Sequence, residues 1–282
     1  MKHFLTVAAA LALALASVPA LASEATFERN LTVNGRVELT VATGSGAIRL
    51  THGSSDRIHV FGRVKSTCWG VNCPDEDKVR EIAANPPIEQ TGNIIRIGAR
   101  HESLHNISIE YEIEAPADAY LSASTGSGNI NDDGIGDNTK LSTGSGSIHA
   151  SGLRGGFSVN TGSGDIFVEA TGQGDVKAQT GSGSVELHDV RGGLHAGTGS
   201  GNIKVSGTAS ADWKLQTGSG SVELWPGSGG MTLDASTGSG VISTDREMTV
   251  QGSFDKHHMT GKIGGGGPTV RVETGSGNIR IH

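Results

Sequence analysis

The tetrapeptide Thr-Gly-Ser-Gly occurs nine times in this 282-residue chain, and the repeat restricts the fold more than any other feature. From Thr125 to Thr237, successive copies are 18 to 20 residues apart. A fixed period of this length is typical of proteins built from stacked coils. The nine copies begin at Thr43, Thr125, Thr143, Thr161, Thr180, Thr198, Thr217, Thr237 and Thr274.

The residues around each copy alternate between apolar and polar. Two residues before the Thr stands Val, Ala or Leu, and five residues after it stands Ile or Val. This period of two on both sides of the glycines predicts two short strands per repeat, each with one buried face. The glycines predict the turn between them, because glycine accepts backbone angles that a Cβ forbids. The Thr shares the inward parity, so we expect its hydroxyl to bond a backbone group at this corner.

These strands predict an all-β fold, a parallel β-helix or β-solenoid with coils of 18–20 residues stacked ~4.8 Å apart. The usual crossover rule favours a right-handed path. The 37-residue step from Thr237 to Thr274 fits two periods with one degenerate copy. The 82 residues between Thr43 and Thr125 leave room for about four coils and an insertion. The chain stops soon after Ile279, which predicts an uncapped end and weak end-to-end self-association.

An insertion at about residues 66–92 interrupts the repeats. Pro74 and the acids after it predict the start of a short helix, with an apolar stripe of Val79, Ile82 and Ala83. Asn85-Pro86-Pro87 predicts its end. We expect strands at residues 57–65, 93–99 and 107–113.

The N-terminus has the pattern of a secretory signal peptide. A basic start, a short apolar run and an Ala-x-Ala ending predict cleavage after Ala22. The remaining residues 23–282 are expected to form one exported domain, in the periplasm, on the cell surface or secreted. The run is too short to span a membrane, and nothing later approaches the required length. Export favours a disulfide between Cys68 and Cys73 over a zinc site, which would need two more ligands.

The histidines and aspartates that could bind a metal or catalyse a reaction have spacings that favour structural or solvent-exposed roles. His101, His105, His257 and His258 are interpreted as solvated side chains. Asp132, Asp133 and Asp137 adjoin glycines, so they are interpreted as turn-forming residues rather than as the paired acids of a sugar-cleaving β-helix enzyme. We therefore expect no catalytic activity, no metal and no cofactor. The formal net charge of −7 argues against nucleic acid as a partner.

A row of small polar residues follows the glycines, one from each coil, and suggests a surface ladder for binding. The alternative is a solvated face with corner hydrogen bonds. The row consists of Asn129, Ser147, Asp165, Ser184, Asn202, Ser221 and Asn278.

The recurrent coils, the passage at residues 113–117 and the ending at residues 261–281 resemble the DUF4097 family. These are bacterial β-strand-repeat proteins labelled as adhesins and related to head domains called GIN. The resemblance implies a role in adhesion. Together with the signal peptide and the residue patterns above, we expect an exported, non-catalytic protein that binds a glycan or a cell-envelope component. The first alternative is a structural, self-associating envelope scaffold. A polysaccharide-active enzyme is a third alternative, ranked below the other two.

Overall fold

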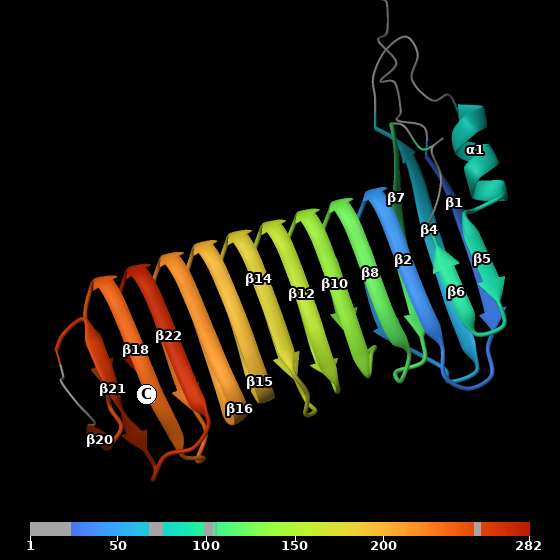
Figure 1. The fold of residues 1–282 in the computed structure, drawn as a ribbon. Helices are drawn as coiled ribbons and strands as arrows, with labels where there is room; N and C mark the ends of the chain where they lie inside the picture. The colour runs from blue at the N-terminus through green and yellow to red at the C-terminus, as the bar shows by residue number, and fades with distance from the viewer. Residues whose placement is uncertain (1–23, 68–75, 99–103, 105, 251–254) are drawn as a thin grey trace, which may run out of the picture.

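The computed structural model of the protein describes residues 24–67, 76–98, 104, 106–250 and 255–282. Within them the chain winds into a flat β-solenoid with two walls (Figure 1). Each coil contributes one strand to the first wall, turns through Gly-Ser-Gly and contributes a second strand to the second wall. The turns form the row of uniform arcs along the upper edge in Figure 1. The predicted all-β solenoid is therefore confirmed.

The first wall is a parallel ladder in which all nine repeat threonines are in register. In spatial order it contains β2 (Glu38–Ser45), β8 (Tyr120–Ser127), β10 (Asn138–Ser145), β12 (Gly156–Ser163), β14 (Val176–Ser182), the second half of β15 (Val185–Ser200), the second half of β16 (Ile203–Ser219), β22 (Thr269–Ser276) and β18 (Met231–Ser239).

The second wall follows the same coil order. Its strands are β3 (Ile48–His52), β9 (Ile130–Asp133), β11 (Ile148–Leu153), β13 (Ile166–Ala170), the first halves of β15 and β16, β17 (Val222–Pro226), β23 (Ile279–Ile281) and β19 (Ile242–Thr244).

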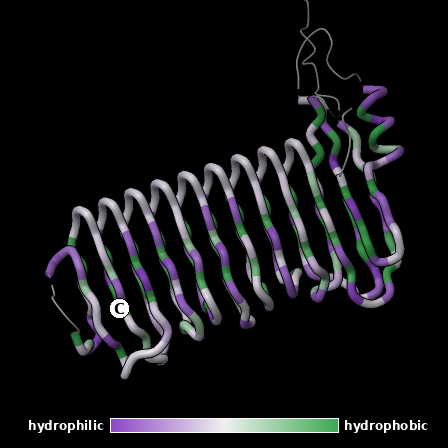
Figure 2. Tube along the Cα trace, viewed as in Figure 1, coloured by the Kyte–Doolittle hydropathy of each residue, from purple (hydrophilic) through white to green (hydrophobic). Residues whose placement is uncertain are grey.

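The core lies between the two walls. The inward columns predicted from the sequence are buried, as Leu141 and Val159 illustrate on the first wall and Ile148 and Ile166 on the second. Stacking these columns removes apolar surface from water in every coil, which no single coil could do alone. Figure 2 shows the alternation along the strands and the pale, Gly- and Ser-rich arcs that join them.

At the N-terminal side, antiparallel strands and a helix close the stack. The second wall continues from β3 through β7 (Ile107–Ala115) and β4 (Arg57–Ser66) to β1 (Glu24–Thr32). The first wall continues through β6 (Ile94–Ile97) to β5 (Ile88–Thr91). Helix α1 (Glu76–Ala84) packs beside β1 and β4 and buries Val79, Ile82 and Ala83. The predicted helix stripe and the three predicted strands are confirmed.

The order of the coils differs from the order of the chain at both ends. Thr43 pairs directly with Thr125, so the intervening residues form the closing elements and not four further coils. Thr274 lies between Thr217 and Thr237, because β22 and β23 are inserted between coils that come earlier in the chain. The prediction of a degenerate coil between Thr237 and Thr274 is therefore wrong.

At the C-terminal side, the premise of an uncapped last coil is also wrong. Strand β21 (His258–Ile263) runs antiparallel along β18 and covers the edge of the first wall. Strand β20 (Met248–Val250) pairs with β21 in turn. The strand that ends the chain, β23, lies inside the second wall between β17 and β19. End-to-end association thus loses the reason for which it was predicted, and it has no other support in the described residues.

Candidate functional site

The arcs between the walls require glycine. In Gly201 φ is +149°, and a Cβ there would lie 2.1 Å from the carbonyl oxygen of Gly183 in the adjacent coil. The same close approach recurs at the second glycine of the other stacked copies. The arcs therefore stack without space for side chains at these positions, and this edge of the solenoid is held by its backbone.

The repeat threonines join neighbouring coils. Thr198 Oγ1 donates to the carbonyl oxygen of Gly183 at 2.8 Å, and Thr217 Oγ1 donates to that of Gly201 at 2.9 Å. Equivalent bonds occur at the other copies, with Thr43 bonding Ile109 instead. The predicted corner role of the hydroxyl is confirmed.

The polar row predicted for binding lies beside these arcs and contacts backbone groups of neighbouring coils. Asn129 Oδ1 accepts a hydrogen bond from the Ser147 amide at 2.9 Å, and Asp165 Oδ1 accepts one from the Ser184 amide at 2.8 Å. Asn202 does the same for the Ser221 amide. These oxygens already have partners, so the row stabilises the stack whatever else it does, and its role in binding stays a prediction.

The three acids considered for sugar cleavage do not form a catalytic pair. Asp132 is buried in β9, where its Oδ1 accepts a hydrogen bond from the Ile135 amide at 3.2 Å and its Oδ2 has no hydrogen-bond partner among the described residues. Desolvation raises the pKa of Asp132 to about 8. Asp133 accepts a hydrogen bond from Ser151, and Asp137 pairs with Arg36 at 3.3 Å. Asp132 therefore has the turn role that was predicted for the cluster.

The other candidate residues stay apart. His257 and His258 lie near the start of β21, where their amides donate to Asp255 Oδ1. These two hydrogen bonds lower the pKa of Asp255. His101, His105, Cys68 and Cys73 lie outside the described residues, as does the signal sequence, so the disulfide and the cleavage site stay predictions. Among the residues with described positions, no three His, Cys, Asp or Glu side chains gather as a metal site.

The first wall presents an outward row of basic residues that the sequence analysis missed. The row occupies the position three residues before six of the nine repeat threonines; at the other three copies this position holds Thr40, Ser122 and Asp234. Reading along the stack, it contains Lys140, Ser158, Lys177, His195, Lys214 and Arg271. We call Lys140, Lys177, His195, Lys214 and Arg271 the basic row. Its signal in the sequence is the recurrence of Lys, His or Arg three residues before the Thr in five of the nine copies.

The second wall presents aromatic rings instead. The His149 ring stacks on Phe167, with ring centres 4.3 Å apart, and His188 lies on the other side of Phe167 at 5.4 Å. Further along, Trp225 stacks on His282 at 4.7 Å. Acidic residues such as Glu186 and Glu223 share this wall. The second wall is therefore richer in stacked rings, whereas the first wall carries the basic row together with acidic and polar residues and the exposed ring of Tyr120.

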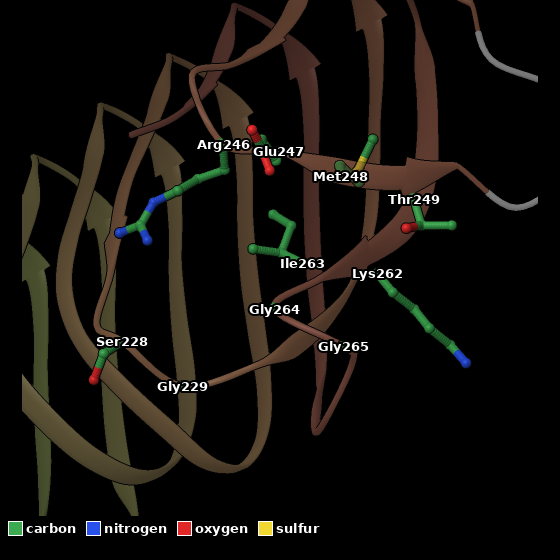
Figure 3. A pocket seen from close by; sticks show the side chains of 10 residues that line it. All are labelled: Ser228, Gly229, Arg246, Glu247, Met248, Thr249, Lys262, Ile263, Gly264 and Gly265. Atoms are coloured by element: carbon green, nitrogen blue, oxygen red, sulfur yellow. The ribbon is translucent and has the colours of Figure 1, made fainter.

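A hollow of about 560 Å³ lies at the C-terminal closing elements, and Figure 3 shows its lining. The guanidinium of Arg246 in this hollow forms two hydrogen bonds with backbone carbonyl oxygens. Its Nε donates to the His282 carbonyl at 2.7 Å and its Nη2 donates to the Pro226 carbonyl at 2.6 Å. Arg246 thus ties β20 to the end of the second wall. Its lining residues are Ser228, Gly229, Arg246, Glu247, Met248, Thr249, Lys262, Ile263, Gly264 and Gly265.

Two smaller hollows lie on the first wall, one toward each end of the basic row. One of about 320 Å³ is lined by Asp212, Trp213, Lys214, Thr269 and Arg271. The other, of about 280 Å³, is lined by Glu38, Leu39, Thr40, Tyr120, Leu121, Ser122, Asn138 and Lys140. The basic row and these hollows form the most continuous candidate binding surface in the described residues.

These features define a parallel β-solenoid with long repetitive faces. None of the described helices is both long and apolar enough to cross a membrane. A family model described as "Toastrack DUF4097" matches residues 87–282. The chain belongs to this family, as its repeats had indicated.

Comparison with solved structures finds distant similarities. A "putative cell adhesion protein" from Clostridium sporogenes is 14% identical, with a TM-score of 0.27, and the match covers 91% of this chain and 99% of that one. A "putative adhesin" from Bacteroides fragilis is 14% identical, with a TM-score of 0.36 and coverage of 92% and 97%. One from Parabacteroides merdae is 11% identical, with a TM-score of 0.34 and coverage of 91% and 96%. No curated protein matches the chain.

Proposed function

We propose that this protein is an exported, non-catalytic binding protein of the cell envelope, acting as an adhesin through the outer faces of its solenoid. The observation that supports this proposal is the shared register of nine coils. Each outward position recurs in the adjacent coil, so one side-chain type can extend over several coils as a continuous row. Such a surface suits an extended, repetitive ligand better than a small substrate.

The absence of catalysis belongs to the same proposal. Asp132, Asp133 and Asp137 have separate partners, and no hydrogen bond joins a hydroxyl side chain to a basic or acidic side chain among the described residues that line the three hollows. The names of the distantly similar structures agree with a role in adhesion, and the sequence of residues 1–22 agrees with export.

The test is binding of residues 23–282 to a broad glycan array and to isolated cell-envelope fractions. We expect selective, saturable binding. A variant Gly126→Val serves as a folding control, because its side chain would collide with the carbonyl oxygen of Gly44 in the next coil. If Gly126→Val loses both binding and the β-sheet circular-dichroism signal, binding requires the folded stack of coils. No binding at tens of micromolar would contradict the proposal and favour the structural scaffold, and hydrolysis of any glycan would favour an enzyme.

A further inference from the structure

The first wall bears the only run of neighbouring basic side chains in the described coils. Most of these side chains form no hydrogen bond or ion pair with the described residues. Lys177, His195, Lys214 and Arg271 occupy four consecutive rungs, while Lys140 lies two rungs before Lys177. From Lys140 to Lys214 the row crosses four rungs, or about 19 Å at the usual strand spacing. We propose that the basic row binds a linear acidic polysaccharide lying along the axis of the stack.

Two neighbouring side chains of this row have the same charge and repel each other. Lys214 lies directly beside Arg271, and like charges on neighbouring strands destabilise a sheet. Within the described part of the chain, Lys140, Lys177 and Lys214 form no ion pair, whereas Arg271 pairs with Asp234 at 3.0 Å. Three lysines in one column that form no ion pair with the described residues, in a chain whose net charge is −7, indicate a functional surface. Its electrostatics select an anionic partner.

A second outward row on the same wall supplies hydrogen-bonding groups. It lies two residues further along each strand and contains Ser142, Asn160, Gln179 and Gln216, with Gly197, which has no side chain, between the last two. Hydroxyl and amide groups can both donate and accept, so they match the hydroxyls of a sugar chain. Gln216 also donates to Glu273, and Glu273 and Asp234 lie at one end of the site. The carboxylates of Asp175 and Asp212 stand two residues before Lys177 and Lys214, and they accept hydrogen bonds from the backbone amides of Gly193 and Thr269.

The shape of the wall also favours an extended polymer. The two hollows of the first wall include Lys140 at one end of the row and Lys214 with Arg271 at the other. Between them, neither outward row contains a large apolar side chain. A surface that binds membranes normally adds apolar residues that enter the lipid. The chemistry of the wall therefore fits acidic sugars better than an anionic bilayer.

This inference rests on the proposed binding function and names its ligand class. The experiment compares binding of residues 23–282 to polygalacturonate, dextran sulfate, uncharged dextran and vesicles containing anionic lipid. The test variant is Lys140→Gln/Lys177→Gln/Lys214→Gln. The control is Lys204→Gln/Lys256→Gln/Arg280→Gln, which removes the same charge from exposed basic residues outside the first wall.

We expect at least one of the two acidic polymers to bind in a salt-dependent manner, and dextran to bind at least tenfold more weakly. The first variant should lose at least tenfold in affinity and the control variant less than twofold. A preference for polygalacturonate assigns carboxylates as the anions, and a preference for dextran sulfate assigns sulfates. Equal losses in the two variants, equal binding of dextran, or binding to vesicles alone would overturn the inference. If the first variant still binds the glycans or envelope fractions that the unmodified chain binds, the proposed function stands and this inference fails.

Discussion

Thr274 lies in register beside Thr217, although 57 residues separate them, and its Oγ1 donates to the carbonyl oxygen of Gly220 at 2.8 Å. On its other side Thr274 pairs with Thr237. The last repeat of the chain thus completes the wall from within. The stack is continuous only because β22 and β23 lie between coils that come earlier in the chain.

This topology predicts that a defect in β22 spreads to two coils distant in sequence. Val272 is fully buried between Leu215 and Ala235. Val272→Ala should cost about 2 kcal/mol through lost contacts. Hydrogen exchange should accelerate in residues 213–219 and 231–239 together. Exchange that accelerates in only one of these segments would contradict the observed order, and Arg280→Ala, on an exposed side chain of β23, is the control.

The stacking of the arcs predicts opposite results for one substitution at two equivalent glycines. A Cβ at Gly126 would lie 2.5 Å from the carbonyl oxygen of Gly44, whereas a Cβ at Gly44 meets no atom within 4 Å. Gly126→Ala should therefore destabilise the protein by at least ~1 kcal/mol, and Gly44→Ala should stay within ~0.5 kcal/mol. Denaturant unfolding measures both. Similar losses in the two variants would refute the role given to coil stacking.

The threonine ladder predicts a hydroxyl-specific effect. Thr198→Val removes the hydrogen bond to the Gly183 carbonyl while keeping a β-branched side chain, so it should cost about 1 kcal/mol. Thr198→Ser keeps the hydroxyl and should retain that hydrogen bond. Thermal unfolding monitored by circular dichroism should place the serine variant closer to the unmodified protein than the valine variant is. The reverse ranking would mean that packing of the methyl group outweighs the hydrogen bond.

Asp132 predicts a pH dependence of stability. Burial raises the pKa of its folded-state carboxyl to about 8 from an ordinary value of 3.8, so between these values the folded protein holds a proton that the unfolded chain has released. The free energy of unfolding should therefore fall as pH rises from about 4 to 8, with a slope on the order of 1 kcal/mol per pH unit from this group.

The variant Asp132→Asn tests this assignment, because a neutral amide cannot release that proton. It should unfold at higher denaturant concentration than the unmodified protein at pH 7, with a smaller difference near pH 4. Asp118→Asn, at an exposed carboxyl outside the core, is the control. A pH slope that persists unchanged in Asp132→Asn would show that other groups cause it.

Local sequence patterns were enough to predict the coil and the short helix. Ile148 and Leu141 stand in columns with period two, and Val79, Ile82 and Ala83 have helical spacing, so each element is determined by its own residues. The order of the coils was not predictable in this way. Coils with the same Thr, Gly and Ile columns fit against one another equally well, so nothing local shows that Thr274 pairs with Thr217 or Thr43 with Thr125.

The candidate site shows a related difference. The polar row predicted for binding follows the glycines of each repeat. In the structure, side-chain oxygens of this row such as Asn129 Oδ1 and Asp165 Oδ1 already accept hydrogen bonds from backbone amides of the next coil. The column of Lys177 and Lys214 contains Ser, Thr and Asp at other copies, so it resembles ordinary variable surface until the register places these lysines on either side of His195.

The most direct test of the binding account is lysine labelling in the presence of a saturating concentration of polygalacturonate or dextran sulfate, whichever binds more tightly. Acetylation followed by mass spectrometry reports each lysine separately, and Lys204 on the second wall provides an internal control. We predict that ligand protects Lys140, Lys177 and Lys214 and leaves Lys204 as reactive as in the free protein. Protection of Lys204 alone, or no protection at the three lysines under saturating ligand, would contradict the claim that the first wall is the binding surface.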